Sequence, residues 1–441
     1  MSRIRRAAAA ALLGGCVAAL PPATAAPAAA KERAPGVERV SVATGGAQAD
    51  AETSGSQISA DGRVAVFESS STTLVPGTTA GRNLYARDLA AGTTELISVA
   101  TDGTQADGPS YSASVSGDGR YVVFDSEATN LVPGRPTGTT LDVYVRDRRT
   151  GRTEALLPPA ATQGSSTSSP SISADGRYVA FSSARADLVP GDTNGQTDVF
   201  VVDRHDNSVR RVSVTSAGGQ ADGFSVGPVI SADGSRVGFK SISDLEPGAT
   251  ASLQRPRARS FYAHDLRTGR TELAGKRLDG GPAAADGPIG LSPDGRFALY
   301  SSTSAGVVEG DTNGKADAFA KDLRTGVTRR LSLAADGSQA NGGSHSGAVM
   351  SADNRRVFFT SDATNLVPGD TNGVGDAFVR DLRTGTVERL SVATGGTQAD
   401  GTTYGVGIDV RGRTAVFDSA AANLVPGDTN GVTDVFVRRT G

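Results

Sequence analysis

The sequence predicts an all-β fold, a seven-bladed β-propeller of four-stranded antiparallel blades that is closed by its N-terminal strand. Three observations predict this fold. A tight turn built around glycine recurs at intervals of 57, 57, 58, 61, 59 and 58 residues. Four segments of strand length follow one another within each interval, and one extra strand precedes the first repeat. Repeats of this length with four short strands are typical of propellers, in which each small sheet packs against its neighbours.

The recurring turn joins the first two strands, a and b, of each repeat. Its sequence reads Ile-Ser-Ala-Asp-Gly-Arg in two repeats and Leu-Ser-Pro-Asp-Gly-Arg in a third. Asp-Gly between two apolar segments favours a hairpin, because glycine accepts a positive φ at no steric cost. The turn residues in chain order are Gly62, Gly119, Gly176, Gly234, Gly295, Asn354 and Gly412.

The strands of a repeat differ in their polarity pattern. Strand b, for example at 178–181, is almost continuously apolar, which indicates burial on both faces. Strand c, for example at 198–201, is joined to strand d by a short turn such as Asp-Leu-Arg-Thr-Gly at 381–385. Strand d, for example at 387–392, alternates polar and apolar residues, as expected of an outer edge.

The order of the strands predicts how the ring closes. The first d strand, at 37–42, precedes every a strand, and the last repeat ends with strand c at 434–437. We therefore expect the N-terminal strand to complete the final blade. This pairing hides the unpaired edge of that blade and joins the two ends of the chain.

The turn segment Ser-Pro-Asp-Gly-Arg at 292–296 and its Ala-Asp-Gly-Arg relatives resemble the WD40-like (PD40) repeat of TolB-type propellers. The resemblance covers about residues 37–441 and implies a binding scaffold in the cell envelope that catalyses no reaction. The chain departs from the family in two respects. TolB has six blades and an extra N-terminal domain, and WD40 repeats carry Trp-Asp at strand ends, whereas this sequence contains no tryptophan.

The N-terminus predicts export. An arginine-rich start is followed by an apolar segment at 7–20, which is too short to span a bilayer, and by a small-x-small cleavage signal at 23–25. We predict a signal peptide at 1–25, a low-complexity linker at 26–36 and the propeller at 37–441. The mature protein is then secreted or otherwise extracytoplasmic, with no transmembrane span.

The single cysteine, Cys16, leaves an alternative open. It lies in Leu-Gly-Gly-Cys, which resembles a bacterial lipobox, so a lipid anchor could be attached there. The other interpretation makes Cys16 one more apolar residue of a discarded signal peptide, and the apolar residues that continue beyond it favour this interpretation.

The b–c and d–a connections are longer than the turns and share one face of such a ring, where binding residues are expected. The b–c connection reads Asp-Thr-Asn-Gly-x-x-Asp in four repeats. Oxygen ligands at positions one, three and seven, with a glycine for the bend, suit calcium. The alternatives are an Asx turn followed by an Asn-Gly turn, or direct contact with a partner. The candidate calcium ligands are Asp192, Asn194, Asp198, Asp311, Asn313, Asp317, Asp370, Asn372, Asp376, Asp428, Asn430 and Asp434.

Two further groups of polar residues lie on the predicted loop face. The d–a connections carry Gln-Ala-Asp or Gln-Ala-Asn, which could line the ring axis and hold a cation, a sugar or a peptide. The alternative is that the Asp caps a turn and the Gln bonds a neighbouring backbone. Repeat four has Arg255, Arg257 and Arg259 in its b–c connection, which either contact an acidic partner or are simply solvated.

The composition and motifs predict a protein that is not an enzyme and has no nucleic-acid partner. The net charge is −3 with mixed signs, no Gly-x-Ser-x-Gly elbow occurs, and His205, His264 and His345 lie in different parts of the repeats. We expect a monomeric, exported binding scaffold for an unknown protein or polysaccharide, with calcium as the one candidate cofactor. The alternative is a propeller glycoside hydrolase or lyase acting on an envelope polysaccharide. The low aromatic content, 5%, argues against this alternative.

Overall fold

The structure, a computed structural model, describes residues 36–135, 140–160, 166–246, 259–345 and 347–440. The predicted signal peptide, most of the linker, Cys16, Arg255 and Arg257 lie outside these residues. Within them, no helix is long and apolar enough to cross a membrane.

The described strands form seven sheets of four antiparallel strands, which confirms the predicted seven-bladed propeller. Blades 1 to 3 comprise β2 (Thr53–Ile58), β3 (Val64–Ser69), β4 (Asn83–Asp88), β5 (Thr93–Leu96); β6 (Ser110–Val115), β7 (Tyr121–Ser126), β8 (Asp142–Asp147), β9 (Arg152–Ala155); and β10 (Thr167–Ile172), β11 (Tyr178–Ser183), β12 (Asp198–Asp203), β13 (Ser208–Arg211).

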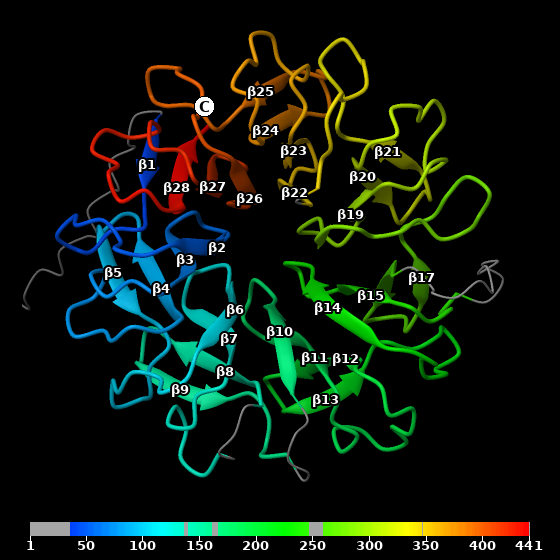
Figure 1. The fold of residues 1–441 in the computed structure, drawn as a ribbon. Helices are drawn as coiled ribbons and strands as arrows, with labels where there is room; N and C mark the ends of the chain where they lie inside the picture. The colour runs from blue at the N-terminus through cyan, green and yellow to red at the C-terminus, as the bar shows by residue number, and fades with distance from the viewer. Residues whose placement is uncertain (1–35, 136–139, 161–165, 247–258, 346, 441) are drawn as a thin grey trace, which may run out of the picture. The chain divides into compact units, whose positions relative to one another are not determined.

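Blades 4 to 7 follow the same order around the ring (Figure 1). They comprise β14 (Ser225–Ile230), β15 (Arg236–Ser241), β16 (Ser260–Asp265), β17 (Thr271–Leu273); β18 (Ile289–Leu291), β19 (Phe297–Ser302), β20 (Asp317–Asp322), β21 (Thr328–Arg330); β22 (Ala348–Met350), β23 (Arg356–Ser361), β24 (Asp376–Asp381), β25 (Val387–Arg389); and β26 (Thr403–Ile408), β27 (Thr414–Ser419), β28 (Asp434–Arg439), β1 (Val37–Arg39).

The N-terminal strand completes blade 7, as predicted. In Figure 1, β1 lies beside β28, and its residues Val37, Glu38 and Arg39 pair with Arg438, Val437 and Phe436. The strand is shorter than the expected 37–42, because the chain turns after Val40 and forms an isolated bridge between Val42 and Gln48. The other d strands shorten in the same way.

The core lies between the blades. Strand b is buried on both faces, as predicted; β3, for example, buries four consecutive residues. An aromatic ring on strand b stacks on a ring from strand c, as in Phe67 and Tyr85, whose centroids are 5.9 Å apart. One apolar cluster joins Phe67 of blade 1 to Val416 and Val435 of blade 7. The hydrophobic effect therefore stabilises blade-to-blade packing rather than single blades.

The a–b turns also connect neighbouring blades. Gly119 has a φ of 71°, and a Cβ there would lie 2.5 Å from Val64 of blade 1. Only glycine fits this close approach without a shift of its neighbour. The turns further carry backbone hydrogen bonds between blades, such as Gly117 N to Ala174 O (2.8 Å) and Val410 N to Ala60 O (2.9 Å).

Candidate functional site at the mouth of the central channel

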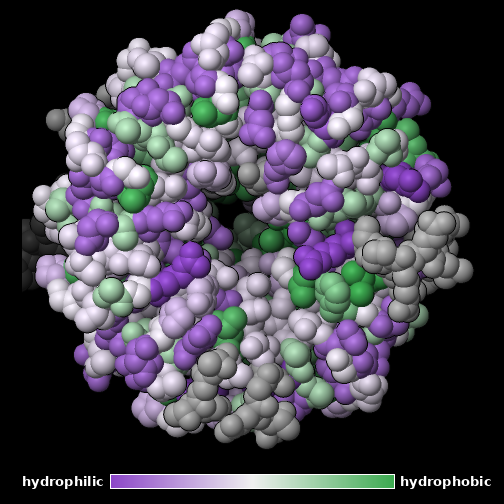
Figure 2. Space-filling view, viewed as in Figure 1, coloured by the Kyte–Doolittle hydropathy of each residue, from purple (hydrophilic) through white to green (hydrophobic). Residues whose placement is uncertain are grey.

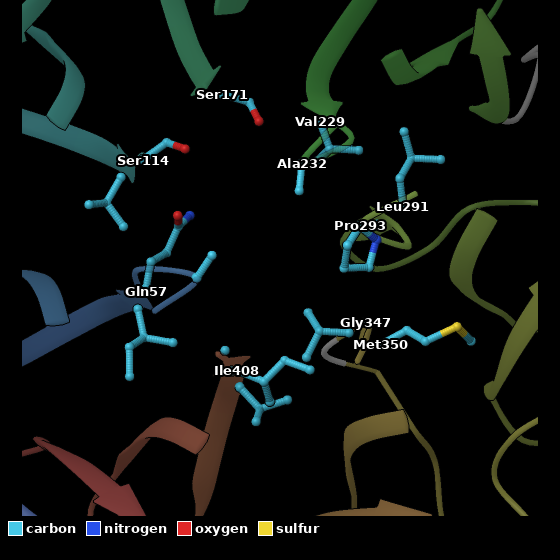
Figure 3. Close-up of a pocket in the computed structure, with 18 of the residues that line it drawn as sticks. Gln57, Ser114, Ser171, Val229, Ala232, Leu291, Pro293, Gly347, Met350 and Ile408 are labelled. Carbon is cyan, nitrogen blue, oxygen red and sulfur yellow. The ribbon is translucent and has the colours of Figure 1, made fainter. Parts of the chain in front are cut away.

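The a strands of all seven blades surround a central cavity of about 510 Å³. Figure 2 shows the opening, with hydrophilic residues around it and hydrophobic residues within. The wall is asymmetric. In Figure 3, Gln57, Ser114 and Ser171 project from blades 1 to 3, whereas blade 4 has Val229 at this position. Blade 5 has Gly290 there. An apolar layer follows toward the turn face, formed by Ile58, Val115, Ile172, Ile230, Leu291, Met350 and Ile408.

Near the loop face, the fifth residue of strand b differs from blade to blade. Blades 7, 1 and 2, which are neighbours in the ring, carry acids at this position, whereas blade 4 carries a lysine. The complete set, from blade 1 to blade 7, is Glu68, Asp125, Ser182, Lys240, Ser301, Thr360 and Asp418.

Each of the three acids accepts a backbone hydrogen bond from the next blade. Asp418 Oδ2 lies 2.9 Å from Gly55 N, Glu68 Oε1 lies 2.9 Å from Ser112 N, and Asp125 Oδ2 lies 2.7 Å from Ser169 N. A β-bulge in strand a frees these amides, since the register of β2, β6 and β10 shifts there. The carboxylates therefore connect blades while remaining near the channel.

Asp125 and Asp418 are almost completely buried, with residue exposures of 2% and 6%. Burial raises the pKa of each carboxyl to about 6, and the negative charge of Glu68 adds to the rise. The second oxygen of each, Oδ1, is buried and has no hydrogen bond of good geometry within the described chain. The hydroxyls of Ser56 and Ser112 nevertheless lie close enough to Asp418 and Asp125, respectively, to oppose the rise in pKa. Asp418 lines the cavity together with Gly55 and Ser56.

Two tyrosines of strand a accompany these acids. Tyr111 pairs with Asp125 across β6 and β7, and the Arg82 guanidinium lies 5.4 Å from its ring centroid. Arg82 Nε also lies 3.3 Å from Glu68 Oε2. In blade 7, Tyr404 has 48% of its surface exposed. We call Glu68, Asp125, Asp418, Tyr111, Tyr404 and Arg82 the acidic wall.

Blade 4, across the ring, carries positive charge at the corresponding height. Burial lowers the pKa of the half-buried Lys240, the charge of Arg259 lowers it further, and Asp286 opposes the shift. Arg259 lies over the Phe224 ring, with 5.4 Å between the guanidinium carbon and the centroid. The mouth is therefore acidic on one side and basic on the other.

The four Asp-Thr-Asn-Gly-x-x-Asp loops do not line the cavity. In each loop, the three candidate calcium ligands lie close together, and the two aspartates contact the same arginine. In blade 3, Arg211 Nη1 lies 3.0 Å from Asp192 Oδ1 and 3.4 Å from Asp198 Oδ2. Asn194 donates its amide to Asp198 (2.8 Å). The same arrangement occurs with Arg330 in blade 5, Arg389 in blade 6 and Arg39 in blade 7.

The position of this arginine is marked in the sequence by the residue opposite it on strand c. The residue of strand d opposite the strand c aromatic is arginine in the four blades with the motif. In blades 1, 2 and 4 it is Leu96, Ala155 and Leu273. Since the guanidinium already lies between the carboxylates, a bound calcium ion would have to displace it. Calcium binding stays a prediction. Within the described residues, no group of three or more His, Cys, Asp or Glu is placed to hold a metal.

The Gln-Ala-Asp connections bond to loops and do not line the cavity. Gln220 Nε2 donates to Thr193 Oγ1 (2.7 Å) in the b–c loop of blade 3. Asp50 accepts from Thr72 N (2.8 Å) and Ser71 Oγ (2.6 Å), and these bonds lower its pKa. Asp50 thus caps the loop as the alternative predicted, and Gln220 also accepts a longer bond from the backbone N–H of Thr193 (3.4 Å).

The three histidines lie apart from one another. His264 is buried, its Nδ1 lies 2.8 Å from Thr271 Oγ1, and burial lowers its pKa to about 4. His345 is exposed and lies 3.9 Å from Asp362. His205 occupies a c–d turn, as expected.

No protein-family model matches the sequence, and no curated protein does either. Among solved structures, the fold is similar to an oligogalacturonate lyase from Vibrio parahaemolyticus, with a TM-score of 0.56 and 12% identity over 92% of this chain and 93% of that one. It is also similar to the propeller domain of the Trilobed protease from Pyrococcus furiosus, with a TM-score of 0.54 and 11% identity over 88% and 95% of the two chains. TolB from Acinetobacter baumannii matches with a TM-score of 0.38 and 15% identity over 70% and 61%.

These similarities show the fold and not the PD40 family. They also overturn the prediction that the protein is not an enzyme. The lyase has the same fold over more than nine-tenths of both chains, so neither the fold nor the missing hydrolase motif excludes catalysis. Binding and catalysis both remain open for this propeller.

Proposed function

We propose that the protein is an exported propeller that binds a protein or cell-envelope ligand at the mouth of its central channel. The predicted signal peptide supports the export. One observation carries the binding site: Asp418, a buried carboxyl that forms no ion pair within the described residues, lines the cavity, and the exposed Tyr404 lies in the strand that pairs with its own. Buried charges are usually paired, so such a carboxyl at a cavity indicates a place for a positive charge.

A blocked mouth tests this proposal. A Cβ at Gly405, which lines the cavity, would meet no atom within 4 Å, and the same is true of Gly395 in a d–a connection away from the cavity. Gly405→Trp therefore fills the mouth, and Gly395→Trp is the matched control. On an array of envelope oligosaccharides and peptides, we expect wild type and control to retain at least one probe that Gly405→Trp loses. The proposal fails if no probe is retained or if Gly405→Trp retains the same probes.

Cleavage of an envelope polysaccharide is the second candidate, and the pKa of Asp418 favours it. A carboxyl with a pKa of about 6 can donate a proton near neutral pH, and Glu68 provides a second carboxylate on the adjacent blade. The exposed Tyr404 offers a ring on which a sugar can stack. We expect wild type, but not Asp418→Asn, to release new reducing ends or unsaturated products from one polysaccharide of a panel. No release by wild type from any member would remove this candidate.

A further inference from the structure

Blades 2 and 7 carry the same pair of residues in the acidic wall, a tyrosine on strand a and an aspartate on strand b. Tyr111 lies opposite Asp125. In blade 7, Thr403 pairs with Ser419 and both hydroxyls meet at 3.2 Å, so the adjacent residues Tyr404 and Asp418 lie on the other face of the sheet.

The two pairs differ in what covers the tyrosine. Arg82, the residue before strand c of blade 1, lies over the Tyr111 ring and pairs with Glu68. The equivalent residue before strand c of blade 6 is Gly375, which has no side chain to cover Tyr404. Tyr404 is accordingly 48% exposed, whereas Tyr111 is partly covered. Blade 2 thus holds a cation supplied by blade 1, whereas Gly375 of blade 6 supplies none to blade 7.

The charge balance in blade 7 also calls for a cation. Asp418 and Glu68 both approach Gly55: Asp418 accepts its amide hydrogen bond, and Glu68 Oε1 lies 3.3 Å from where a Cβ would be. Within the described chain, Arg82 forms an ion pair with Glu68 and not with Asp418. The hydrogen bonds that Asp418 receives come from Gly55 and Ser56, which are neutral, and the charged group that acts on it is Glu68, which has the same sign. A donor with positive charge would offset this electrostatic deficit.

We propose that blade 7 binds an organic cation, an ammonium or guanidinium group of the ligand, over the Tyr404 ring and beside Asp418. An aromatic face together with a carboxylate is a favourable environment for such a cation. A chelated metal ion fits less well, because the acids of the wall belong to different blades and no described group of three is placed for one. This inference rests on the proposed function and specifies the chemistry of its site.

The closing experiment uses calorimetry of the mature protein with trilysine, triarginine and a glucosamine trimer, each beside its neutral counterpart (N-acetylated lysine and glucosamine, citrulline for arginine). We expect at least one cationic probe to bind and its neutral form to fail. The probe that binds distinguishes a peptide source of the cation from an amino-sugar source.

The variants are chosen to imitate blade 2. Gly375→Arg places a guanidinium where Arg82 lies in the other pair, and Gly375→Ala is its control. The nearest atom to a Cβ at Gly375 is Asp362 Oδ1 at 2.8 Å, the end of an exposed side chain that can move. We expect Gly375→Arg, Tyr404→Ala and Asp418→Asn to weaken binding at least tenfold, and Gly375→Ala and Tyr404→Phe to change it less than threefold.

Two results would overturn the inference. One is that no cationic probe binds to wild type; the other is that binding is unchanged in Gly375→Arg and Tyr404→Ala. If the array ligand is still lost in Gly405→Trp in either case, the proposed function stands and only the cation is wrong. If the array also retains nothing, both fail together.

Discussion

Arg39 in the first described strand donates a hydrogen bond to Asp434 in the last, with 3.3 Å between Nη1 and Oδ2, although 395 positions separate them. The same guanidinium lies 2.9 Å from Asp428, and the side chains of both aspartates are at most 3% exposed. One arginine thus neutralises two buried carboxylates and holds the strand that closes the ring. In blade 3, Arg211 does the same within a continuous segment of chain.

Removing Arg39 should weaken the pairing of β1 with β28, which closes the ring. Arg39→Met leaves Asp428 and Asp434 buried without a counter-charge, which costs about 3 kcal/mol of unfolding free energy. Denaturant unfolding measures this loss. Arg211→Met, the control, should cost a similar amount, but only Arg39→Met should increase hydrogen exchange in β1 and β28. Equal exchange of these strands in both variants would contradict a role of Arg39 in closure.

Calcium should act on the loops only after the arginine is removed. Because a guanidinium lies between Asp192 and Asp198, we expect calcium and chelator to leave the melting temperature of the wild type unchanged. In Arg211→Ala, calcium should raise it by a few degrees, since a divalent ion can replace the lost charge. A calcium-dependent rise in the wild type would instead support all four loops as calcium sites.

The stability of the protein should depend on Asp418 in a pH-dependent way. Burial raises its pKa from 3.8 to about 6, so between these values the folded state holds a proton that the unfolded state has released. The stabilising effect is complete below pH 4 and is lost as the pH rises through 6. Glu68 is the charged group that faces Asp418, and it adds to this loss. Asp418→Asn should therefore raise the unfolding free energy at pH 7.5 by about 1–3 kcal/mol and change it little at pH 4.

Two measurements check this dependence. Denaturant unfolding at both pH values gives the difference between the variant and wild type. Asp336→Asn, at an exposed position in a d–a connection, is the control: hydrogen bonds from Ser338 lower the pKa of Asp336, so this variant should not be stabilised at pH 7.5. If the Asp418 variant is equally stabilised at both pH values, or destabilised at pH 7.5, the charged form of Asp418 does not destabilise the folded state.

Asn354 should stabilise the junction of blades 5 and 6 in two ways. It occupies the turn position that is glycine elsewhere, with a φ of 55°, and its Nδ2 lies 2.8 Å from Asp294 Oδ2 of blade 5. Asn354→Ala loses the bond and strains the backbone, at a cost of about 2 kcal/mol, whereas Asn354→Gly loses only the bond, at about 1 kcal/mol. Thermal unfolding ranks the variants. If the glycine variant is as unstable as the alanine variant, the backbone conformation contributes nothing.

The blade count and the closure could be predicted because their signals are local and repeated. Each Asp-Gly turn and each apolar b strand can be recognised within ten residues of sequence. The d strand at the N-terminus precedes every a strand, and the last repeat has no d strand of its own, so the N-terminal strand can only complete the last blade. The strand ends were less predictable. Strand d stops early, because its last residues bend into a bridge such as Val392 with Gln398, and no local pattern marks this bend.

The functional groups were harder to find, since the register of the sheets brings them together. Arg389 is 19 and 13 positions from its partners Asp370 and Asp376, so the pairing is visible only once strands c and d are aligned. Asp418 is the fifth residue of a strand that we recognised by its apolar residues, and its role depends on Gly55, 363 positions away. The low aromatic content of the whole chain also gave no sign of Tyr404, which is exposed next to the cavity-lining residue Gly405.

The seven junctions between blades are not equally bonded. Asp418, Glu68, Asp125 and Ser182 each accept an amide from the next blade, but Lys240 cannot accept one, and Ser301 Oγ is buried without a partner in the described chain. At the turn face, a backbone N–H of one blade donates to a carbonyl of the next, as Gly117 does to Ala174. Pro293 of blade 5 has no N–H for such a bond to blade 6. On this face, the junctions around the acidic wall are therefore held by backbone amides, whereas the junction of blades 5 and 6 depends on the Asn354 side chain, which bonds Asp294, and Arg380 adds a bond to Ala334 O. A substitution at one side chain can thus weaken that junction, while the junctions beneath the proposed site depend on amides that every residue except proline has.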